Sequence, residues 1–327
     1  MNSHSKKRTV PVLLAAGGML LLLLLSGCGK QSHLENAYSF EDRETVLSAG
    51  MSGQAPLFAE DLCVITGETQ DDDTSVAAGA GALFDVTDAS VLYSKHATER
   101  MYPASITKVM TALIAIEEGN LSDTVTVTGD AVITEAGASL CGIKPGDQIT
   151  LEQLLYGLMM PSGNDAANAI AVHMSGSLDA FVQRMNERAK ELGATQTHFM
   201  NPSGLSDENH YTTAYDLYLI FNEALKLPLF REIIHTQSYT AQYTDASGAP
   251  VSQTWNVGNW YQKGDTETPD GLTVLGGKTG TTKAAGYCLI MAVDDSSGGE
   301  YISVVLKSDS RPALYENMTN IITKIVN

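Results

Sequence analysis

The stretch Y-P-A-S-I-T-K-V-M-T-A-L-I-A-I-E-E-G, residues 102–119, joins a polar first turn to an apolar run. Most of the run is hydrophobic, and Gly119 is a typical C-terminal stop. We therefore predict a buried helix over residues 104–118. Its first turn carries Ser105 and Lys108, and side chains three residues apart share a face of a helix. The hydroxyl and the amine are expected to touch.

A serine in contact with a lysine can carry out acyl transfer. A serine hydroxyl is a weak nucleophile alone and needs a base beside it. A lysine can be that base when burial or a neighbouring cation lowers its pKa. The Ser-x-x-Lys pattern is not specific, since Ser3–Lys6 also matches it. A polar pair at the start of a helix is the simpler interpretation.

Two further motifs each occur once in the chain. Ser162-Gly163-Asn164 lies between the end of an apolar helix and the start of another, where a helix N-cap is the simpler interpretation. Lys278-Thr279-Gly280 precedes a glycine-punctuated β-run, where a turn at a strand edge is the simpler interpretation. Both motifs therefore have a structural and a catalytic interpretation.

The three motifs, in this order, resemble the signature of penicillin-binding proteins and class A β-lactamases. Their surroundings are similar to the D-alanyl-D-alanine carboxypeptidases, which are low-molecular-weight penicillin-binding serine peptidases. The similar segments are residues 102–117, 159–171, 198–217 and 276–293. The resemblance runs from about Gly79 to the C-terminus. It implies a mixed α/β (α+β) fold of the β-lactamase/transpeptidase type, with an antiparallel sheet flanked by helices and an all-helical subdomain inserted.

The resemblance also implies catalytic roles. Ser105 attacks the carbonyl between two D-alanines and becomes the acyl-enzyme, while Lys108 takes its proton. Ser162 relays a proton toward the leaving amine or toward Lys108. Asn164 orients Lys108 or holds the substrate amide.

Five residues are implied in substrate binding. Lys278 supplies positive charge that lowers the pKa of the catalytic lysine and attracts the substrate carboxylate, which the Thr279 hydroxyl contacts. Gly280 allows close backbone approach. The N–H of Thr281 joins that of the nucleophile in binding the oxyanion. Arg311 resembles a family arginine that helps bind the terminal carboxylate, although a surface arginine at a helix start explains it as well.

The implied substrate is a peptidoglycan stem peptide ending in D-Ala-D-Ala, and the implied inhibitors are β-lactams. No cofactor or metal is expected. One alternative is a serine β-lactamase, although no Glu-x-x-x-Asn precedes the Lys-Thr-Gly motif. Another is a penicillin-binding sensor without turnover, which usually needs a membrane-spanning signalling module.

The N-terminus has the layout of a lipoprotein signal peptide. Positive residues 6–8 precede an apolar run, Val10–Leu25, and Leu-Ser-Gly-Cys at 25–28 resembles a bacterial lipobox. We expect cleavage after residue 27, a lipid on Cys28 and a location on the extracytoplasmic face of the cell membrane. A plain transmembrane anchor is the alternative, but the apolar run is short for a span.

The remaining chain is organised around one catalytic domain. We predict a flexible tether over 28–60 and the domain over 61–327. Because strands are indicated at both ends with helices between, the sheet should come from about 61–118 and 272–327, with a mainly helical insertion at about 121–271. The chain ends about 47 residues after the Lys-Thr-Gly motif, so we expect no C-terminal β domain. We also expect the protein to be a monomer.

Local patterns inside the domain indicate several elements. Paired apolar runs predict hairpins over 81–95 and 286–308. Thr150 followed by Gln153, and Thr213 followed by Asp216, have the spacing of helix caps. We therefore expect helices to begin directly after each of the two threonines.

Composition narrows the partners. The formal net charge of the 327 residues is −18, and no basic stripe is present, which argues against nucleic acid. The histidines and cysteines lack metal-ligand spacing. Besides Cys28, the chain has Cys63, Cys141 and Cys288, so at most one intramolecular disulfide is possible.

Overall fold

The computed structural model describes residues 61–67 and 73–326. The expected signal peptide 1–27, the lipid attachment at Cys28 and the tether 28–60 lie outside the described residues.

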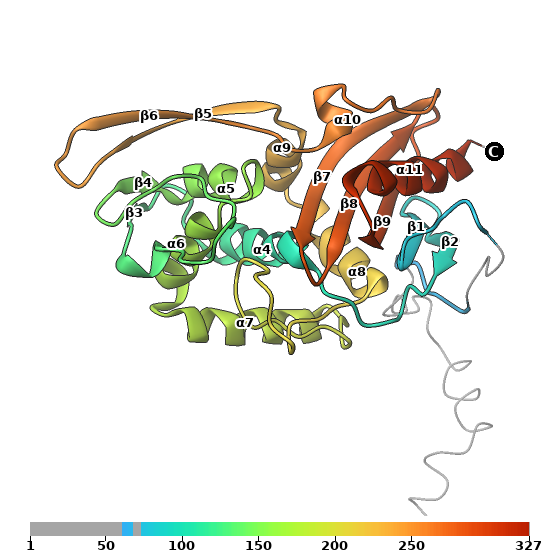
Figure 1. Ribbon diagram of the computed structural model, residues 1–327, viewed down its shortest axis with the longest axis horizontal. Coiled ribbons are helices and arrows are strands. Elements are labelled where there is room, and N and C mark those ends of the chain that lie inside the picture. The colour runs from blue at the N-terminus through green and yellow to red at the C-terminus, as the bar shows by residue number, and fades with distance from the viewer. Residues whose placement is uncertain (1–60, 68–72, 327) are drawn as a thin grey trace, which may run out of the picture. The chain divides into compact units, whose positions relative to one another are not determined.

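A five-stranded antiparallel sheet joins the two ends of the described chain (Figure 1). The strand order is β2-β1-β9-β8-β7. The strands are β1 (Ala80–Asp85), β2 (Ser90–Lys95), β7 (Leu272–Thr282), β8 (Gly286–Asp295) and β9 (Glu300–Ser308). Strand β9 lies between β1 and β8, and Ala80 pairs with Leu306. The expected hairpins β1–β2 and β8–β9 are confirmed, as is a sheet built from both chain ends.

Both faces of the sheet are covered by helices. Successive side chains of a strand point to opposite faces, and buried residues of β8 alternate accordingly. Ile290 faces the large core under α4 (Lys108–Glu118) and α8 (Ala214–Leu225), whereas Leu289 faces the core under α11 (Arg311–Ile322). Because both faces are covered, β8 is a nearly continuous apolar run.

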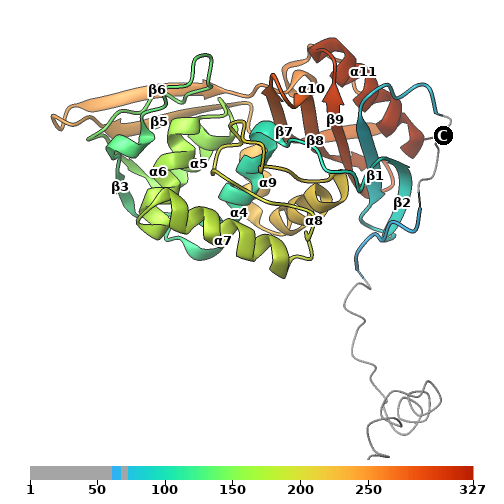
Figure 2. The ribbon, with the colours of Figure 1, turned by 60° about the horizontal axis from the view of Figure 1, so that its bottom comes forward.

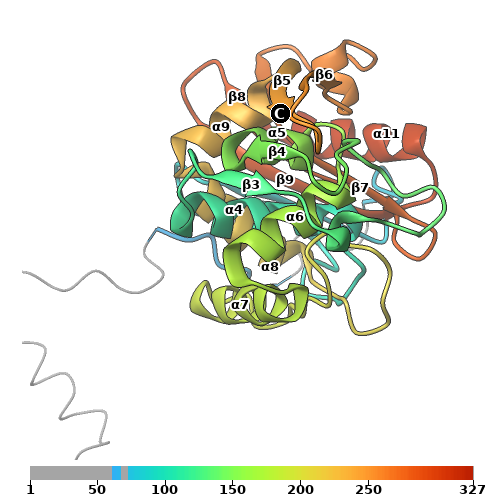
Figure 3. The same cartoon turned by 90° about the vertical axis from the view of Figure 1, so that its left-hand side faces the viewer.

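Helix α4 is the centre of the helical part, most of which lies to the left of β7, β8 and β9 in Figure 1. It contacts α5 (Leu151–Met159), α6 (Asn164–Ser175), α7 (Leu178–Glu191), α8 and α9 (Pro228–His235). Its residues from Lys108 to Ala115 are all buried. Helix α7 lies on the side of α4 opposite the β5–β6 hairpin described below (Figure 3).

Side-chain caps fix where two of these helices begin. The Thr150 hydroxyl accepts from the Gln153 N–H at 3.2 Å, at the start of α5. The Thr213 hydroxyl accepts from the Asp216 N–H at 3.0 Å, at the start of α8. Both caps satisfy a backbone donor that a helix start would otherwise leave unpaired, and both were predicted from the sequence.

The insertion is not all-helical, which corrects the expectation from the sequence. It contains a second antiparallel sheet of order β3-β4-β5-β6. Its strands are β3 (Thr124–Thr126), β4 (Gln148–Thr150), β5 (Ser238–Thr244) and β6 (Pro250–Asn256). The β5–β6 hairpin extends past the helices (Figure 2). Its Tyr239 ring stacks on the Tyr156 ring of α5, with 3.7 Å between the ring centroids.

Four short elements complete the fold. They are the 3₁₀ turns η1 (Ala104–Thr107), η2 (Gly129–Ala131) and η3 (Thr323–Ile325), and the one-turn helix α10 (Trp260–Lys263).

Cys63, Cys141 and Cys288 are all buried free thiols. Within the described residues, no helix has the length and apolarity needed to cross a membrane. No group of three or more potential metal ligands gathers in that same part of the chain.

Candidate active site

The nucleophile candidate lies on a 3₁₀ turn. Residues 104–107 form η1, and the α-helix begins only at Lys108. Side chains three residues apart eclipse one another on a 3₁₀ turn, so the Lys108 Nζ reaches the Ser105 Oγ at 3.0 Å. The predicted contact is confirmed, while the backbone of the turn differs from the predicted α-helix.

Lys108 is fully buried and has three oxygen neighbours. Besides Ser105, its Nζ lies 2.6 Å from the Asn164 Oδ1 and 2.6 Å from the carbonyl oxygen of Ser203. A neutral amine has two hydrogens and one lone pair. The two hydrogens fit Asn164 and Ser203, which leaves the lone pair facing the Ser105 hydroxyl.

Burial and charge prepare Lys108 to act as a base. Burial lowers its pKa well below the ordinary value, and the positive charge of Lys278 lowers it further. The carboxylate of Asp165 acts in the opposite direction. Because the pKa is depressed, a larger share of Lys108 is neutral near pH 7 than of an exposed lysine.

The Ser-Gly-Asn motif lies between α5 and α6, and it does not cap α6. The cap position is Gly163, which makes no side-chain cap bond. Ser162 has a φ of +63°, a left-handed conformation that costs a serine free energy. Its Oγ accepts from the Lys278 Nζ at 3.0 Å. Asn164, the first residue of α6, reaches Lys108 instead.

The Lys-Thr-Gly motif lies on β7, which is an edge strand of the large sheet. Lys278 is 2% exposed, and burial lowers its pKa to about 7. Its Nζ also donates to the carbonyl of Thr279 at 2.9 Å. A Cβ on Gly280 would lie 3.0 Å from the Ser105 nitrogen. Glycine therefore lets β7 pack directly against η1.

A cleft of about 280 Å³ opens over the nucleophile. Ser105, Asn164 and Thr281 line it, together with segments 135–139 and 204–206. Asp165 holds the loop that follows the first of these segments, because its carboxylate accepts from the N–H groups of residues 141 and 142, both at 2.8 Å. The cleft therefore brings together residues from both the sheet and the insertion.

Arg311 is not part of this hydrogen-bonded cluster. It is exposed at the first position of α11, and its guanidinium carbon lies 6.0 Å from the centroid of the Trp260 ring. Arg311 is thus a surface residue at a helix start, and its role in binding the terminal carboxylate stays a prediction.

His210 supports the nucleophile turn and was not predicted. Its Nδ1 accepts from the Met200 N–H at 3.2 Å, so its Nε2 carries the hydrogen that is donated to the Thr107 Oγ1 at 2.8 Å. Burial lowers its pKa to about 4, so the ring is neutral near pH 7. A single histidine without a spaced partner leaves no catalytic signal in the sequence.

A buried lysine that faces a serine hydroxyl, with a second lysine–serine pair beside it in a cleft, defines a serine hydrolase that works by acyl transfer. Comparison with known protein families supports the same class of enzyme. The D-alanyl-D-alanine carboxypeptidase family model matches residues 66–310, and the chain belongs to this family.

Curated relatives carry the same description. The D-alanyl-D-alanine carboxypeptidase DacF of Bacillus subtilis is 36% identical over 216 residues, and the match covers 65% of this chain and 53% of the relative. The D-alanyl-D-alanine carboxypeptidase of Streptomyces sp. strain K15 is 34% identical over 288 residues, or 84% of this chain and 92% of the relative. The chain thus spans about half of the first relative and nearly all of the second.

The fold has solved counterparts. The crystal structure of the Streptomyces K15 DD-transpeptidase superposes with a TM-score of 0.71 at 33% identity, covering 76% of this chain and 97% of that one. A D-alanyl-D-alanine carboxypeptidase from Mycobacterium tuberculosis superposes with a TM-score of 0.66 at 30% identity, covering 76% and 90%. The predicted transpeptidase-type fold is confirmed.

Proposed function

We propose that the chain is a serine-type D-Ala-D-Ala carboxypeptidase, which removes the terminal D-alanine from peptidoglycan stem peptides through an acyl-enzyme on Ser105. Membership of the family supports the reaction class. The observation that carries the assignment of residues is the 3.0 Å contact between the Ser105 Oγ and the buried Lys108 Nζ.

Acylation starts at this pair. The Ser105 Oγ attacks the carbonyl carbon of the penultimate D-alanine, and its proton passes to the neutral Nζ of Lys108. The backbone N–H groups of Ser105 and Thr281 stabilise the oxyanion. Lys278 and the Thr279 hydroxyl hold the carboxylate of the terminal D-alanine. The C–N bond then breaks, and the leaving amine takes a proton that reaches it from Lys108 through the Ser162 hydroxyl.

Deacylation repeats the scheme with water. Lys108, neutral again after giving up its proton, takes one from a water molecule that attacks the ester carbonyl. The tetrahedral intermediate collapses, the Ser105 Oγ regains a proton from Lys108, and the shortened peptide leaves. The same base thus serves both halves of the cycle.

The two alternatives are not favoured. The relatives reported above are described as carboxypeptidases, and neither a β-lactamase nor a sensor is among them. The Streptomyces K15 structure is described as a DD-transpeptidase, and transfer to an amine differs from hydrolysis only in the acceptor. A transpeptidase side reaction is therefore a second candidate for this chain.

The test combines a substrate and an inhibitor. The purified protein should release D-alanine from diacetyl-L-Lys-D-Ala-D-Ala and should be labelled covalently by fluorescent penicillin. Ser105→Ala should lose both activities, while Ser247→Ala, at the turn of the exposed β5–β6 hairpin, should retain both. Labelling that survives Ser105→Ala would refute the nucleophile. Adding glycylglycine and measuring a transfer product tests the side reaction.

Rapid hydrolysis of a chromogenic cephalosporin without release of D-alanine would instead indicate a β-lactamase. Stable acylation by penicillin without turnover of any peptide would indicate a sensor. These outcomes separate the three functions because they report which acyl donor reacts with Ser105 and whether the acyl-enzyme is then hydrolysed.

We also propose that a lipid on Cys28 anchors the protein to the extracytoplasmic face of the membrane. The support is the charged residues 6–8, the apolar run and the Leu-Ser-Gly-Cys sequence. Growth with an alkynyl fatty acid should label the wild type, and Cys28→Ala should accumulate as an unlabelled precursor. Equal labelling of both forms would refute the anchor. Light scattering on a soluble form starting at residue 58 checks the expected monomer.

A further inference from the structure

A narrow gap beside Thr282 separates the catalytic cleft from a second cavity. Residues 204–206 and Thr282 line both the cleft and a narrow gap beside it, and Tyr102 lines this gap together with them. Tyr102 and the turn residues Ala284 and Ala285 in turn line a cavity of about 350 Å³. The shared residues show that the three hollows adjoin one another.

The proposed function fixes which part of the substrate points toward this cavity. The terminal D-alanine lies between Ser105 and Lys278, because Lys278 holds its carboxylate. The acyl part of the peptide therefore leaves the reacting carbonyl toward the other end of β7, past Thr281 and Thr282. An edge strand can pair with an extended peptide in this way. The residue before D-Ala-D-Ala is thereby directed toward the second cavity.

Charges of both signs line the second cavity. Glu99, Arg100, Glu208 and Lys307 are all exposed on its wall. Among the ion pairs of residues 61–67 and 73–326, none involves Arg100, Glu208 or Lys307. The Arg100 guanidinium lies 4.4 Å from the centroid of the Tyr211 ring. Its Nε donates to the Gln196 Oε1 at 2.9 Å, so the group is held in place with other donors to spare.

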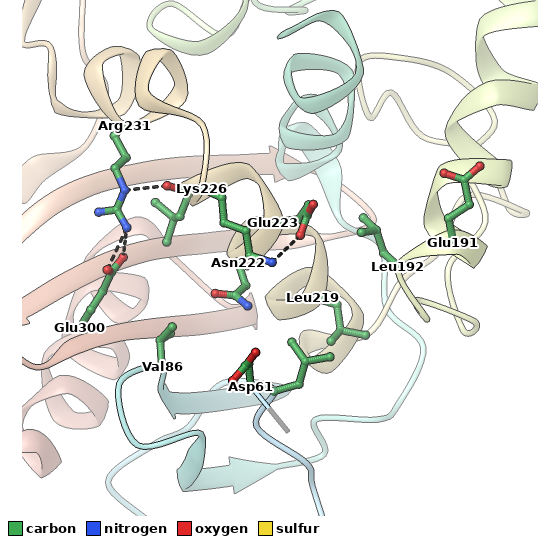
Figure 4. A pocket seen from close by; sticks show the side chains of 12 residues that line it. Asp61, Val86, Glu191, Leu192, Leu219, Asn222, Glu223, Lys226, Arg231 and Glu300 are labelled. Atoms are coloured by element: carbon green, nitrogen blue, oxygen red, sulfur yellow. Dashed lines mark hydrogen bonds and ion pairs between the residues drawn. The ribbon is translucent and has the colours of Figure 1, made fainter. Parts of the chain in front are cut away.

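In another cavity of the molecule, both lining cations are already paired with carboxylates (Figure 4). It has a volume of about 450 Å³ and lies between α8, α9 and the sheet. There Arg231 donates twice to the carboxylate of Glu300, at 2.6 and 2.8 Å, and Lys226 pairs with Glu223 at 2.8 Å. The cavity beside the catalytic cleft is different, because no ion pair among the described residues neutralises its two cations.

The backbone at Lys307 is strained in a way that serves the second cavity. The pairing of β8 with β9 shifts register between Tyr287 and Leu289, which indicates a bulge in β9 opposite them. Within it Lys307 has a φ of +59°, and it is exposed between the buried residues Leu306 and Ser308. Bulges next to active sites often redirect a side chain. A positive φ is uncommon in a residue other than glycine, which makes Lys307 unlike an ordinary surface lysine.

We propose that this second cavity binds the stem-peptide residue before D-Ala-D-Ala, and that it selects a diamino acid whose side chain ends in both an amine and a carboxylate, as in diaminopimelate. The inference rests on the proposed function. Arg100 and Lys307 would bind the side-chain carboxylate, and Glu208 would bind the amine, since Glu99 already pairs with His96 at 2.8 Å. A side chain ending in an amine alone, as in lysine, would leave both cations without a partner.

The test compares three acetylated tripeptides that differ only in the residue before D-Ala-D-Ala. This residue is N-ε-acetyl-lysine, lysine or diaminopimelate. We expect kcat/KM for D-alanine release to be about tenfold higher for the diaminopimelate peptide than for the lysine peptide, the size of one good charged contact. The advantage should shrink as the salt concentration rises. Equal rates for all three peptides, or a preference for lysine, would overturn the proposal.

Variants locate the selectivity. Arg100→Gln and Lys307→Gln should each lower the ratio of kcat/KM for the diaminopimelate peptide to kcat/KM for the N-ε-acetyl-lysine peptide. Lys226→Gln removes the same charge from the cavity of Figure 4 and should preserve the advantage. If the cavity variants behave like Lys226→Gln, the site is wrong.

A second measurement keeps this inference separate from the proposed function. The three peptides are used as competitors that slow penicillin labelling of Ser105, which reports binding without turnover. The diaminopimelate peptide should compete best, and Lys307→Gln should remove its lead. If no peptide releases D-alanine but this order of competition holds, the proposed function fails and the subsite stands. Equal competition by all three peptides refutes the subsite.

Discussion

The Cα of Gly204 faces the carbonyl oxygen of Ala104 so closely that a Cβ on Gly204 would lie 1.8 Å from that oxygen. Gly204 also has a φ of +87°, which only glycine adopts at little cost. The loop that follows Ser203 is thus packed against the residue before the nucleophile. The position of Ser105 depends on this contact as well as on α4.

Gly204→Ala should therefore displace the nucleophile turn. We expect penicillin acylation to slow by about a hundredfold, since a shift near 1 Å is enough for such a loss. Gly248→Ala is the matched control, because Gly248 has a φ of +84° but a Cβ there would have no neighbouring atom within 4 Å. It should cost about 1 kcal/mol of stability and leave acylation intact. Equal acylation rates in the two variants would disprove the displacement.

Lys278→Gln should change the pH dependence of acylation. The charge of Lys278 helps lower the pKa of Lys108, so its removal raises that pKa. Because Lys108 must be neutral to act as base, the acidic limb of the rate profile should move to higher pH. The wild-type profile should also fall as Lys278, whose pKa is about 7, loses its proton, and the variant should lack that fall. Penicillin labelling rates across pH measure both limbs, with Lys190→Gln on α7 as the control.

Two substitutions at Ser162 should separate the effect of its hydroxyl on turnover from the effect of its backbone conformation on stability. Ser162→Ala and Ser162→Gly both remove the hydroxyl that bonds to Lys278, so both should lose about a hundredfold in turnover. Only glycine relieves the φ of +63°, and it should be more stable than the alanine variant by about 1 kcal/mol. Urea unfolding and D-alanine release give the two readouts. A difference in activity between the variants would assign the loss to the backbone instead.

His210 should make the protein less stable in acid. Its pKa is lowered from 6.5 to about 4, so between these pH values the imidazole is protonated in the unfolded chain but neutral in the folded protein. Its contribution to stability is complete above pH 6.5 and falls as the pH drops toward 4. That loss amounts to about 3 kcal/mol for a shift of this size. His210→Gln should show a shallower loss of unfolding free energy over this range, and identical slopes would contradict the assignment.

Much of the fold could be predicted because local patterns agree with long-range packing. Thr150 and Thr213 are followed three residues later by the N–H groups they cap, so both helix starts were readable. The β5–β6 hairpin was missed, although buried Ala241 and Tyr243 alternate with exposed residues. A tight turn follows, in which the Asp245 carboxylate accepts from the Ser247 N–H at 2.8 Å. Most residues of the two strands are polar, so the alternation of apolar and polar residues is weak and gives little indication of a strand.

The site was predictable in its side chains but not in its backbone groups. Ser105, Lys108, Ser162, Asn164 and Lys278 were named from motifs, and the structure brings them together in two hydrogen-bonded groups beside the cleft. The Ser203 carbonyl that binds Lys108 could not be named, because every residue has a carbonyl and only the fold selects one. Arg311 was named because its position after the last β-run resembles that of a family arginine, and its role in binding substrate stays a prediction.

The central position of β9 has a consequence for the order in which the protein is made. Strand β1 is synthesised early, yet one of its two neighbours in the sheet is the strand farthest along the described chain, with Gly81 opposite Val305. Until β9 has emerged, the β1–β2 hairpin and the β7–β8 hairpin that carries Lys278 cannot join into one sheet. The first moment at which a growing chain could react with penicillin therefore comes after β9 has been synthesised. Penicillin labelling of chains in the course of production would serve as a clock for completed folding.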